Sequence, residues 1–312
     1  MSELVLREVE KLEITILVDN YTDVLAIEGT DVLRRPLIPL TSMPVLAEHG
    51  FSCLLRLSSG SQEYQVLMDA GMSSICLFHN AYRLWVDLST IDTMVLSHGH
   101  FDHFGGLQEF VDKANKGVNL VLHPDAFLQR RLNIPTGTQV DMPALNTESL
   151  KEPKVTLSRI EGPSLLAAGH VLVTGEVERV TDFEKGFPWA EARINGEWVI
   201  DPFRDDQGLA VKVKGKGLVV IGGCSHAGII NTVLHAQKVA QTTRVHAVLG
   251  GFHLTGPIFE PIIGRTIEEM KRINPDYVIP MHCTGWNAIN HFAKEMPSQF
   301  LLNTVGTTYV FQ

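Results

Sequence analysis

The stretch "VLSHGHFDHFGG" (residues 95–106) places three histidines and an aspartate within six positions, directly after a short apolar run. Imidazole nitrogens and carboxylate oxygens are ligands that zinc, iron and manganese accept. His98 and His100 are two residues apart, so they point to the same side of an extended backbone and can share one metal ion. Asp102 and His103 project differently and can hold a second ion. The sequence therefore predicts a metal centre rather than a solvated polar turn.

Ligand-type side chains, including His98 of this motif, stand at several places where apolar, strand-like runs end. They are Asp69, His98, Glu176, Cys224, His226, His253 and His282. The runs alternate with helix-like stretches at residues 105–117, 228–243 and 260–275, and this alternation indicates α/β layers. Ligands of open α/β sheets bind at the edge that the strand ends form, so we expect these side chains to meet there.

The composition excludes several classes of protein. The chain has 312 residues, 45% of them hydrophobic, and a net charge of −9, which disfavours a broad electrostatic grip on nucleic acid. Its four cysteines are scattered without a CxxC pair, so a disulfide framework is not expected. No apolar run reaches the ~20 residues that cross a bilayer, and the N-terminus does not resemble a signal peptide. We expect a cytoplasmic protein with a small-molecule substrate and neither a nucleic-acid nor a membrane partner, while its oligomeric state stays open.

No linker or internal repeat divides the chain, so residues 1–312 are expected to form a single domain. Two stretches, 21–48 and 124–165, contain several prolines and scattered polar residues and show no clear strand or helix pattern. Long loops usually act as functional covers, and we expect irregular cover segments at both places.

The motif "HGHFDH" (98–103) has the form H-x-H-x-D-H and resembles the signature of the metallo-β-lactamase superfamily. "YQVLMDAG" (64–71) resembles the first motif of that superfamily, and "DYVIPMHCTG" (276–285) resembles its closing motif, which supplies His282. The resemblance covers most of the chain. It implies an α/β (α+β) fold, the αββα sandwich of two packed sheets with outer helices. It also implies two divalent metal ions, with zinc expected first and iron or manganese as alternatives.

The middle ligands depart from the superfamily pattern. Glu176 stands where a histidine is usual, and Cys224 stands where the bridging aspartate is usual, with His226 two residues later. A thiolate is a competent ligand, but a buried cysteine is also a common small hydrophobe. The predicted metal ligands are His98, His100, Asp102, His103, His226 and His282, with Cys224 and Glu176 as further candidates.

Several segments together resemble a narrower branch of the superfamily, the 7,8-dihydropterin-6-yl-methyl-4-(β-D-ribofuranosyl)aminobenzene 5′-phosphate synthases. They include "HGFSCLLRL" (49–57), "VTGEVERV" (173–180), "GCSHAGIIN" (223–231) and "LGGFHL" (249–254). This resemblance implies a metal-dependent enzyme of methanopterin biosynthesis that acts on a phosphorylated or pterin-type small molecule. Two other functions remain open: a dinuclear-metal hydrolase of an ester or a phosphodiester, and a non-catalytic metal-binding sensor.

Further roles follow from chemistry and position. Two ions close together can lower the pKa of a shared water toward ~7 and clamp a developing anion. Asp102 would bind one ion and accept a hydrogen bond from the attacking water, while His253 could either bind a metal ion or donate to the substrate. Asn20, Asp206 and Gln207 are the predicted substrate-binding residues. Three arginines near irregular segments are candidates for binding an anionic substrate: Arg130, Arg131 and Arg204.

Overall fold

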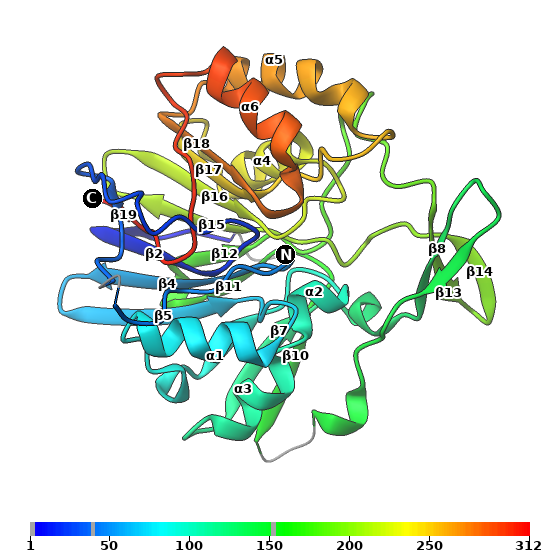
Figure 1. Cartoon of the computed structure of the whole chain (residues 1–312), viewed down its shortest axis with the longest axis horizontal. Coiled ribbons are helices and arrows are strands. Elements are labelled where there is room, and N and C mark those ends of the chain that lie inside the picture. The colour runs from blue at the N-terminus through cyan, green and yellow to red at the C-terminus, as the bar shows by residue number, and fades with distance from the viewer. Residues whose placement is uncertain (1–3, 39–40, 151–153) are drawn as a thin grey trace.

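The computed structural model describes residues 4–38, 41–150 and 154–312. Its strands form two large sheets that stack face to face, and helices cover both outer faces (Figure 1). This arrangement is the predicted αββα sandwich. Among the described residues, no helix is both long and apolar enough to cross a membrane.

The first large sheet has eight strands, most of them from the amino-terminal half of the chain. In spatial order they are β10 (Val155–Arg159), β7 (Val118–Leu122), β6 (Thr93–Val95), β5 (Gln62–Met68), β4 (Ser52–Ser59), β2 (Lys11–Val18), β19 (Thr308–Phe311) and β3 (Leu33–Arg34). β5, β6 and β7 run parallel, so their carboxyl ends lie at the same edge. The neighbouring strands β4, β2 and β19 pair antiparallel.

The second large sheet has seven strands. They are β11 (Ser164–Leu166), β12 (Val171–Val173), β15 (Leu209–Val213), β16 (Gly217–Gly222), β17 (Val245–Gly251) and β18 (Tyr277–Met281) in spatial order, with β1 (Glu8–Val9) paired to β15. β16, β17 and β18 run parallel. Each large sheet therefore has one block of parallel strands whose ends can carry a site.

Helices pack on the outer face of each sheet (Figure 1). The α-helices are α1 (Ser74–Arg83), α2 (Phe101–Phe104), α3 (Leu107–Lys113), α4 (Ile229–Val239), α5 (Ile263–Ile273) and α6 (Trp286–Glu295). Short 3-10 turns lie at Leu88–Thr90, Pro124–Phe127, Thr147–Ser149, Ala167–Gly169, Glu260–Ile262 and His282–Thr284. The predicted helical stretches contain α3, α4 and α5, whereas α1, α2 and α6 were not predicted.

The strand β2 shows how alternation builds the core. Leu12, Ile14 and Ile16 are fully buried between the two sheets. Leu17 points the other way and joins the apolar cluster beneath α1, which includes Leu77. Successive side chains of a strand alternate between its faces, so one strand can serve both layers.

A third, smaller sheet projects from one end of the sandwich (Figure 1). Its four strands are β14 (Glu197–Ile200), β13 (Ala190–Ile194), β8 (Arg130–Asn133) and β9 (Gln139–Asp141). The prediction of an irregular segment over 124–165 is therefore partly wrong. β8 pairs with β13, far along the chain, and such long-range pairing leaves little local pattern.

The other predicted cover segment, 21–48, contains only the two-residue strand β3 within its described part. Residues 1–3, 39–40 and 151–153 lie outside the described residues, so parts of both predicted cover segments are not described.

Candidate metal centre

The carboxyl ends of strands from both large sheets converge on one edge of the sandwich. Asp69 follows β5 and His98 follows β6 in the first sheet, while Cys224, His253 and His282 follow β16, β17 and β18 in the second. The parallel direction of each block places these ends side by side. The edge holds two overlapping groups of candidate ligands.

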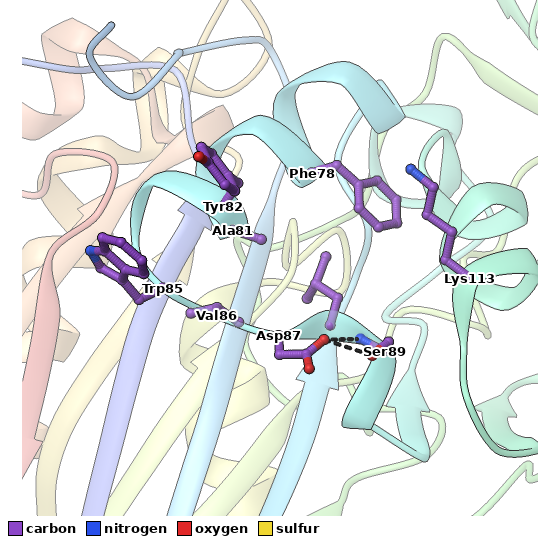
Figure 2. Close-up of a pocket in the computed structure, with 9 residues that line it drawn as sticks. Phe78, Ala81, Tyr82, Trp85, Val86, Asp87, Ser89 and Lys113 are labelled. Carbon is purple, nitrogen blue, oxygen red and sulfur yellow. Dashed lines mark hydrogen bonds between the residues drawn. The ribbon is translucent and has the colours of Figure 1, made fainter. Parts of the chain in front are cut away.

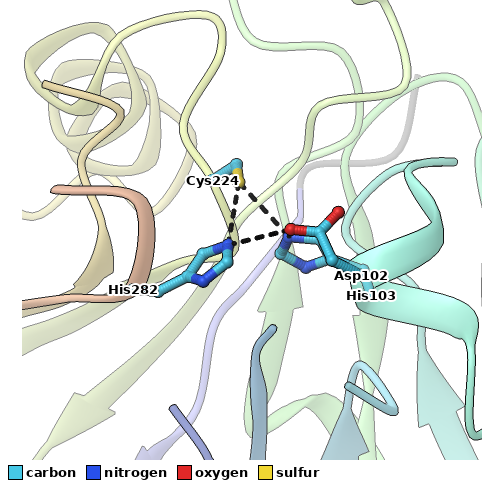
Figure 3. Close-up of side chains that lie close together, drawn as sticks. All are labelled: Asp102, His103, Cys224 and His282. Carbon is cyan, nitrogen blue, oxygen red and sulfur yellow. Dashed lines mark hydrogen bonds and ion pairs between the residues drawn. The ribbon is translucent and has the colours of Figure 1, made fainter. Parts of the chain in front are cut away.

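The first group joins Asp102, His103, Cys224 and His282 (Figure 3). Cys224 Sγ lies 3.2 Å from His103 Nε2 and 3.3 Å from His282 Nε2. Asp102 Oδ2 lies 3.6 Å from His103 Nε2 and 3.4 Å from His282 Nε2. Ligand atoms around one tetrahedral zinc ion are separated by roughly 3.3–3.8 Å. One ion therefore fits among these four side chains.

The second group joins His98, His226 and Cys224. The Nε2 atoms of His98 and His226 lie 3.2 Å apart. The ring of His100 stands beside both, with centroid distances of 4.6 Å to His98 and 4.8 Å to His226. Because Cys224 belongs to both groups, its sulfur lies where a ligand shared by two ions would be.

Asp69 and Ser97 orient the histidines from behind. Asp69 Oδ2 lies 2.6 Å from His103 Nδ1, which leaves Nε2 of that ring turned toward Cys224. Ser97 Oγ donates to Asp69 Oδ2 at 2.7 Å and lies 3.0 Å from His98 Nδ1. Carboxylates in this position fix the tautomer of a ligating histidine. Sequence reasoning noted Asp69 at its strand end without giving it a role, and it missed Ser97.

A similar arrangement holds His282. Asp19, at the end of β2, accepts the His282 backbone N–H at 2.8 Å, and Asn20 Oδ1 lies 3.3 Å from His282 Nδ1. The predicted substrate residue Asn20 thus contacts a candidate ligand. His49, which sequence reasoning missed, places Nε2 3.5 Å from Asp102 Oδ2. Asp19 could have been found from its place after the apolar run "ITILV".

The backbone at this edge is strained. Non-glycine residues with positive φ include Asp69 (59°), Phe203 (49°), Ser225 (58°), His253 (47°) and His282 (52°). Such conformations are rare for side-chain-bearing residues, and they cluster at functional sites where the surrounding structure enforces them. Of these residues, His282 belongs to the first ligand group and Asp69 contacts His103.

The histidines of the second group are held neutral. Burial, aided by neighbouring histidines and Arg130, lowers the pKa of His98, His100 and His226 well below the usual value. A neutral imidazole is the form that binds a metal ion. These three imidazoles can therefore bind a cation without first losing a proton, whereas burial raises the pKa of the Cys224 thiol, which must lose its proton to bind as a thiolate.

The first group carries the negative charge of the site. Burial disfavours a charged His103, but Asp102 and Asp69 outweigh it and raise the pKa of His103 to about 9. Burial likewise opposes ionisation of Asp102, yet His103 and His282 hold its pKa well below the usual range. An environment that favours a positive charge on His103 equally favours a cation at its Nε2.

Four buried imidazole nitrogens lack a hydrogen-bond partner within the described chain. Three lie at this edge, His100 Nε2, His226 Nδ1 and His253 Nδ1, and the fourth is His170 Nδ1. A buried polar atom without a partner costs free energy, so each such atom calls for an explanation. Nitrogen, thiolate and carboxylate donors in buried groups of three and four form the ligand set of zinc. The residues present therefore fit a metal centre.

Glu176 does not enter either group. Its side chain is exposed, and its backbone N–H donates to Glu161 O at 2.8 Å. His226, from a different strand end, completes the group with His98 instead.

The predicted substrate-binding residues Asp206 and Gln207 are both buried. Asp206 Oδ2 accepts the Ala227 N–H at 2.8 Å, and Gln207 Nε2 donates to Leu96 O at 2.9 Å. The other carboxylate oxygen of Asp206, Oδ1, and the amide oxygen of Gln207, Oε1, have no partner among the described residues. Burial raises the pKa of Asp206 to about 6. Both residues brace the loops that carry His98 and His226.

The three predicted arginines all have carboxylate partners. Arg130 Nε lies 2.6 Å from Asp201, and Arg130 Nη2 lies 2.7 Å from Asp205. Arg131 Nε lies 2.6 Å from Glu191, and Arg204 Nε lies 2.7 Å from Asp125. Asp205 also accepts the Gly99 N–H at 2.8 Å. The Arg130 network thereby fixes the turn between His98 and His100.

Two cavities flank the ligand groups. One of about 360 Å³ is lined by His226 and His253 together with Phe183, Lys185 and Phe259. The His253 ring lies 4.2 Å from the His226 ring and 4.5 Å from the Phe259 ring, between centroids.

The other cavity, of about 260 Å³, is lined by His282, Asn20 and Trp286. A separate apolar pocket around Phe78 and Trp85 lies by α1 and contains none of the predicted site residues (Figure 2).

The chain is similar to several known proteins. A sequence model of the metallo-beta-lactamase superfamily matches residues 59–282. The 7,8-dihydropterin-6-methyl-4-(beta-D-ribofuranosyl)-aminobenzene-5'-phosphate synthase of Methanocaldococcus jannaschii is 32% identical over 266 residues, which cover 82% of this chain and 88% of that protein. The uncharacterized protein MJ0448 of the same organism is 32% identical over 252 residues, covering 80% of this chain and 88% of its own length.

Among solved structures, the crystal structure of Tm1679, a metal-dependent hydrolase of the beta-lactamase superfamily, superposes with a TM-score of 0.74. It is 27% identical and the alignment covers 95% of this chain and 98% of that one.

Proposed function

The chain belongs to the metallo-beta-lactamase superfamily, and from this premise we propose that it is a two-metal enzyme acting on a phosphorylated, pterin-type small molecule. The observation that carries the proposal is the pair of ligand groups that share Cys224. One group, with Asp102, His103 and His282, supplies the negative charge. The other, with His98, His226 and the adjacent His100, supplies neutral nitrogens.

The ligand assignment follows from these groups. Asp102, His103, Cys224 and His282 would hold one divalent ion, and His98, His100, His226 and Cys224 would hold the other. Zinc matches the mixture of nitrogen, sulfur and carboxylate donors best. When bound, the ions supply Lewis acidity and attraction for developing negative charge.

The substrate class rests on the Methanocaldococcus jannaschii relative. The product in the name of that enzyme joins a pterin-6-methyl group to an aminobenzene that carries a ribofuranosyl phosphate. The cavity beside His226 and His253 has aromatic walls from Phe183 and Phe259, which suit a flat heterocycle. Lys185 lies in the same lining and can meet a phosphate oxygen.

The chain's own residues can carry the proton transfers of such a condensation. The aminobenzene nitrogen would attack the pterin methylene carbon, and the bond from that carbon to a diphosphate oxygen would break. Asp102, the carboxylate of the first ligand group, can accept the proton that the nitrogen loses. His253, which lines the aromatic cavity, can hold a proton toward the departing oxygen.

A direct assay tests this proposal. The metal-loaded protein is incubated with a dihydropterin methyl diphosphate and 4-(β-D-ribofuranosyl)aminobenzene 5′-phosphate, and the coupled product is measured by mass spectrometry. We expect coupled product and diphosphate in equal amounts, and a loss of roughly 10²–10⁴-fold in rate for Asp102→Asn. Absence of coupled product from metal-loaded protein would contradict the synthase proposal.

A second candidate function is metal-dependent hydrolysis of a phosphodiester or another ester. The similarity to Tm1679, a metal-dependent hydrolase with 27% identity over nearly the whole chain, favours it. Turnover of a generic phosphodiester without coupled product would support hydrolysis. Tight metal binding with neither reaction would instead support a metal-binding sensor.

A further inference from the structure

A third set of ligand atoms lies beside the two groups described above. Cys224 Sγ, a ring nitrogen of His253 and Cys283 Sγ all lie within 4.8 Å of one another. Cys283 follows His282 directly in the 3-10 turn after β18, and His253 follows β17. Cys283 has no place in the two ligand groups on which the proposed function rests.

The backbone brings the two sulfur atoms together. A Cβ atom at Gly251 would lie 2.6 Å from Cys283 Sγ and 3.2 Å from Cys224 Cα, so only glycine lets the two cysteines approach across β17. Cys283 Sγ then reaches within 3.4 Å of Cys224 O. Both cysteines are buried, with 5% and 3% of their surfaces exposed. The two cysteines are therefore a buried part of the strand edge and not a chance contact at the surface.

His253 completes the set from the neighbouring strand. It adopts a left-handed backbone conformation with φ of 47°, which costs free energy at a histidine. Its Nδ1 atom is buried and has no hydrogen-bond partner among the described residues. A strained position together with an unpaired buried nitrogen indicates that this ring is held for a ligand.

We propose that Cys224, His253 and Cys283 form a further metal position, rich in sulfur, next to the two-metal centre. Ligand atoms around a tetrahedral ion with two sulfurs and one nitrogen are separated by roughly 3.5–3.8 Å, within the observed limit of 4.8 Å. Two thiolates and an imidazole select zinc, cadmium or copper(I) over magnesium, calcium or manganese. The position takes a thiophilic cation.

Cys224 links this position to the other two groups, because its sulfur belongs to all three. An ion held by Cys283 and His253 draws the same sulfur toward itself and away from Asp102 and His98. A thiophilic ion at this position therefore competes for the Cys224 sulfur with the ions of the two-metal centre. Removal of Cys283 weakens that competition. The inference requires a metal centre at this strand edge but not any particular substrate.

Cobalt substitution of the full chain tests the proposal. Cobalt(II) shows visible bands for any tetrahedral site and a near-ultraviolet charge-transfer band only for bound thiolates. We expect this near-ultraviolet band in the native chain and a loss of about half its intensity in Cys283→Ser, since one of two thiolates is removed. Cys76→Ser, which changes a buried cysteine of α1 outside the centre, should keep the full band.

The outcomes separate this inference from the proposed function. Equal near-ultraviolet bands in the native chain and Cys283→Ser would overturn the sulfur-rich position while leaving the two-metal centre intact. Visible bands without any thiolate band would overturn the sulfur-rich position and would also remove Cys224 from the ligands of the two-metal centre. Failure to bind cobalt at all would overturn both proposals. If Cys283→Ser does not fold, cadmium-113 NMR of the native chain replaces it: a signal in the range of two sulfur ligands is expected, and signals with at most one sulfur contradict the position.

Discussion

Asp69 shows why the H-x-H-x-D-H motif does not make the centre by itself. The motif supplies His103, but Asp69 holds its Nδ1 at 2.6 Å and so decides which nitrogen faces Cys224. Asp69 also binds the Ser97 N–H and hydroxyl at 2.7 Å each, which fixes the start of the motif. One carboxylate from β5 therefore sets the orientation of residues that follow β6.

Replacing Asp69 by Asn should weaken metal binding without removing a ligand. The amide cannot supply the charge that favours a cation at His103, and loss of such a partner costs 10–100-fold in metal affinity. Metal affinity is measured by competition with a chelating dye. Asp92→Asn, an exposed aspartate at the start of β6, is the matched control and should bind as the native chain does. An unchanged affinity in Asp69→Asn would contradict the orienting role.

His226 and Glu176 both stand at strand ends, but we expect opposite effects on metal content when each is replaced. His226→Ala should lose one of two metal equivalents per chain, because its Nε2 faces His98 Nε2 at 3.2 Å. Glu176→Gln should keep both equivalents, since its side chain is exposed and outside the ligand groups. The metal content of each variant after dialysis, measured by mass spectrometry of the ions, tests both expectations. Loss of metal in Glu176→Gln would contradict the assignment.

At this scale the sequence singled out ligand-type residues that, apart from Glu176, the fold brings to one edge, but it did not indicate their hydrogen-bond partners. The spacing of His98, His100, Asp102 and His103 was enough to indicate a metal site. The roles of Ser97 and Asp19 depend on hydrogen bonds to residues from other strands. Such bonds form only after folding, so no local pattern could have assigned them.

At the scale of elements, helix α4 depends on a buried carboxylate from another part of the chain. Glu184 accepts the N–H groups of Ile230 and Asn231 at 2.9 Å each, at the amino end of α4. Gly228 precedes the helix, and a Cβ there would lie 2.1 Å from Glu184 Cδ. The glycine thus makes room for a carboxyl group that replaces the missing side-chain cap.

Glu184 should make the stability of the protein depend on pH. Burial outweighs the helix N–H groups and raises the pKa of Glu184 from 4.5 to about 7. The folded state therefore binds the proton more tightly than the unfolded state. The stabilisation is complete below pH 4.5 and is lost as the pH rises through about 7, a change of roughly 3 kcal/mol in the free energy of unfolding.

Urea unfolding at several pH values, comparing the native chain with Glu184→Gln, measures this effect. The variant should lack the fall in stability between pH 4.5 and about 7, whereas Glu197→Gln, an exposed change on β14, should retain it. The same pH dependence in native and Glu184→Gln protein would refute the explanation.

Helix prediction succeeded where local signals were strong and failed where they were weak. The stretches for α3, α4 and α5 follow the glycine-rich ends of strands and carry a clear helical pattern. α1 was missed, although Ser73 caps it and Leu77 and Ala81 are buried one turn apart. α6 begins after Gly285 without a side-chain cap. Tertiary packing completes both helices.

At the scale of the whole molecule, Arg130 connects the small third sheet to the metal centre. The guanidinium on β8 is 2% exposed and pairs with Asp201 at 2.6 Å and Asp205 at 2.7 Å. Asp205 in turn holds the backbone of Gly99. The sequence could not reveal this connection, because β8 and its partner strand β13 lie far apart along the chain.

Arg130→Met should destabilise the fold by about 3–5 kcal/mol, since it leaves two buried carboxylates unpaired. Arg131→Met, on the same strand but paired with Glu191 near the surface, is the matched control and should cost about 0–1 kcal/mol. Urea unfolding provides both values. Equal losses in the two variants would show that the buried network does not connect the sheets as described.

The central claim is that the strand edge holds two metal ions that share Cys224. A crystal structure of the zinc-loaded protein with anomalous scattering data tests it most directly. We predict two anomalous peaks roughly 3.5–4 Å apart, one contacting Asp102, His103, Cys224 and His282, and the other contacting His98, His226 and Cys224. A structure in which Cys224 does not contact both ions would contradict the claim, and so would one in which fewer than two of His98, His100 and His103 contact a metal ion.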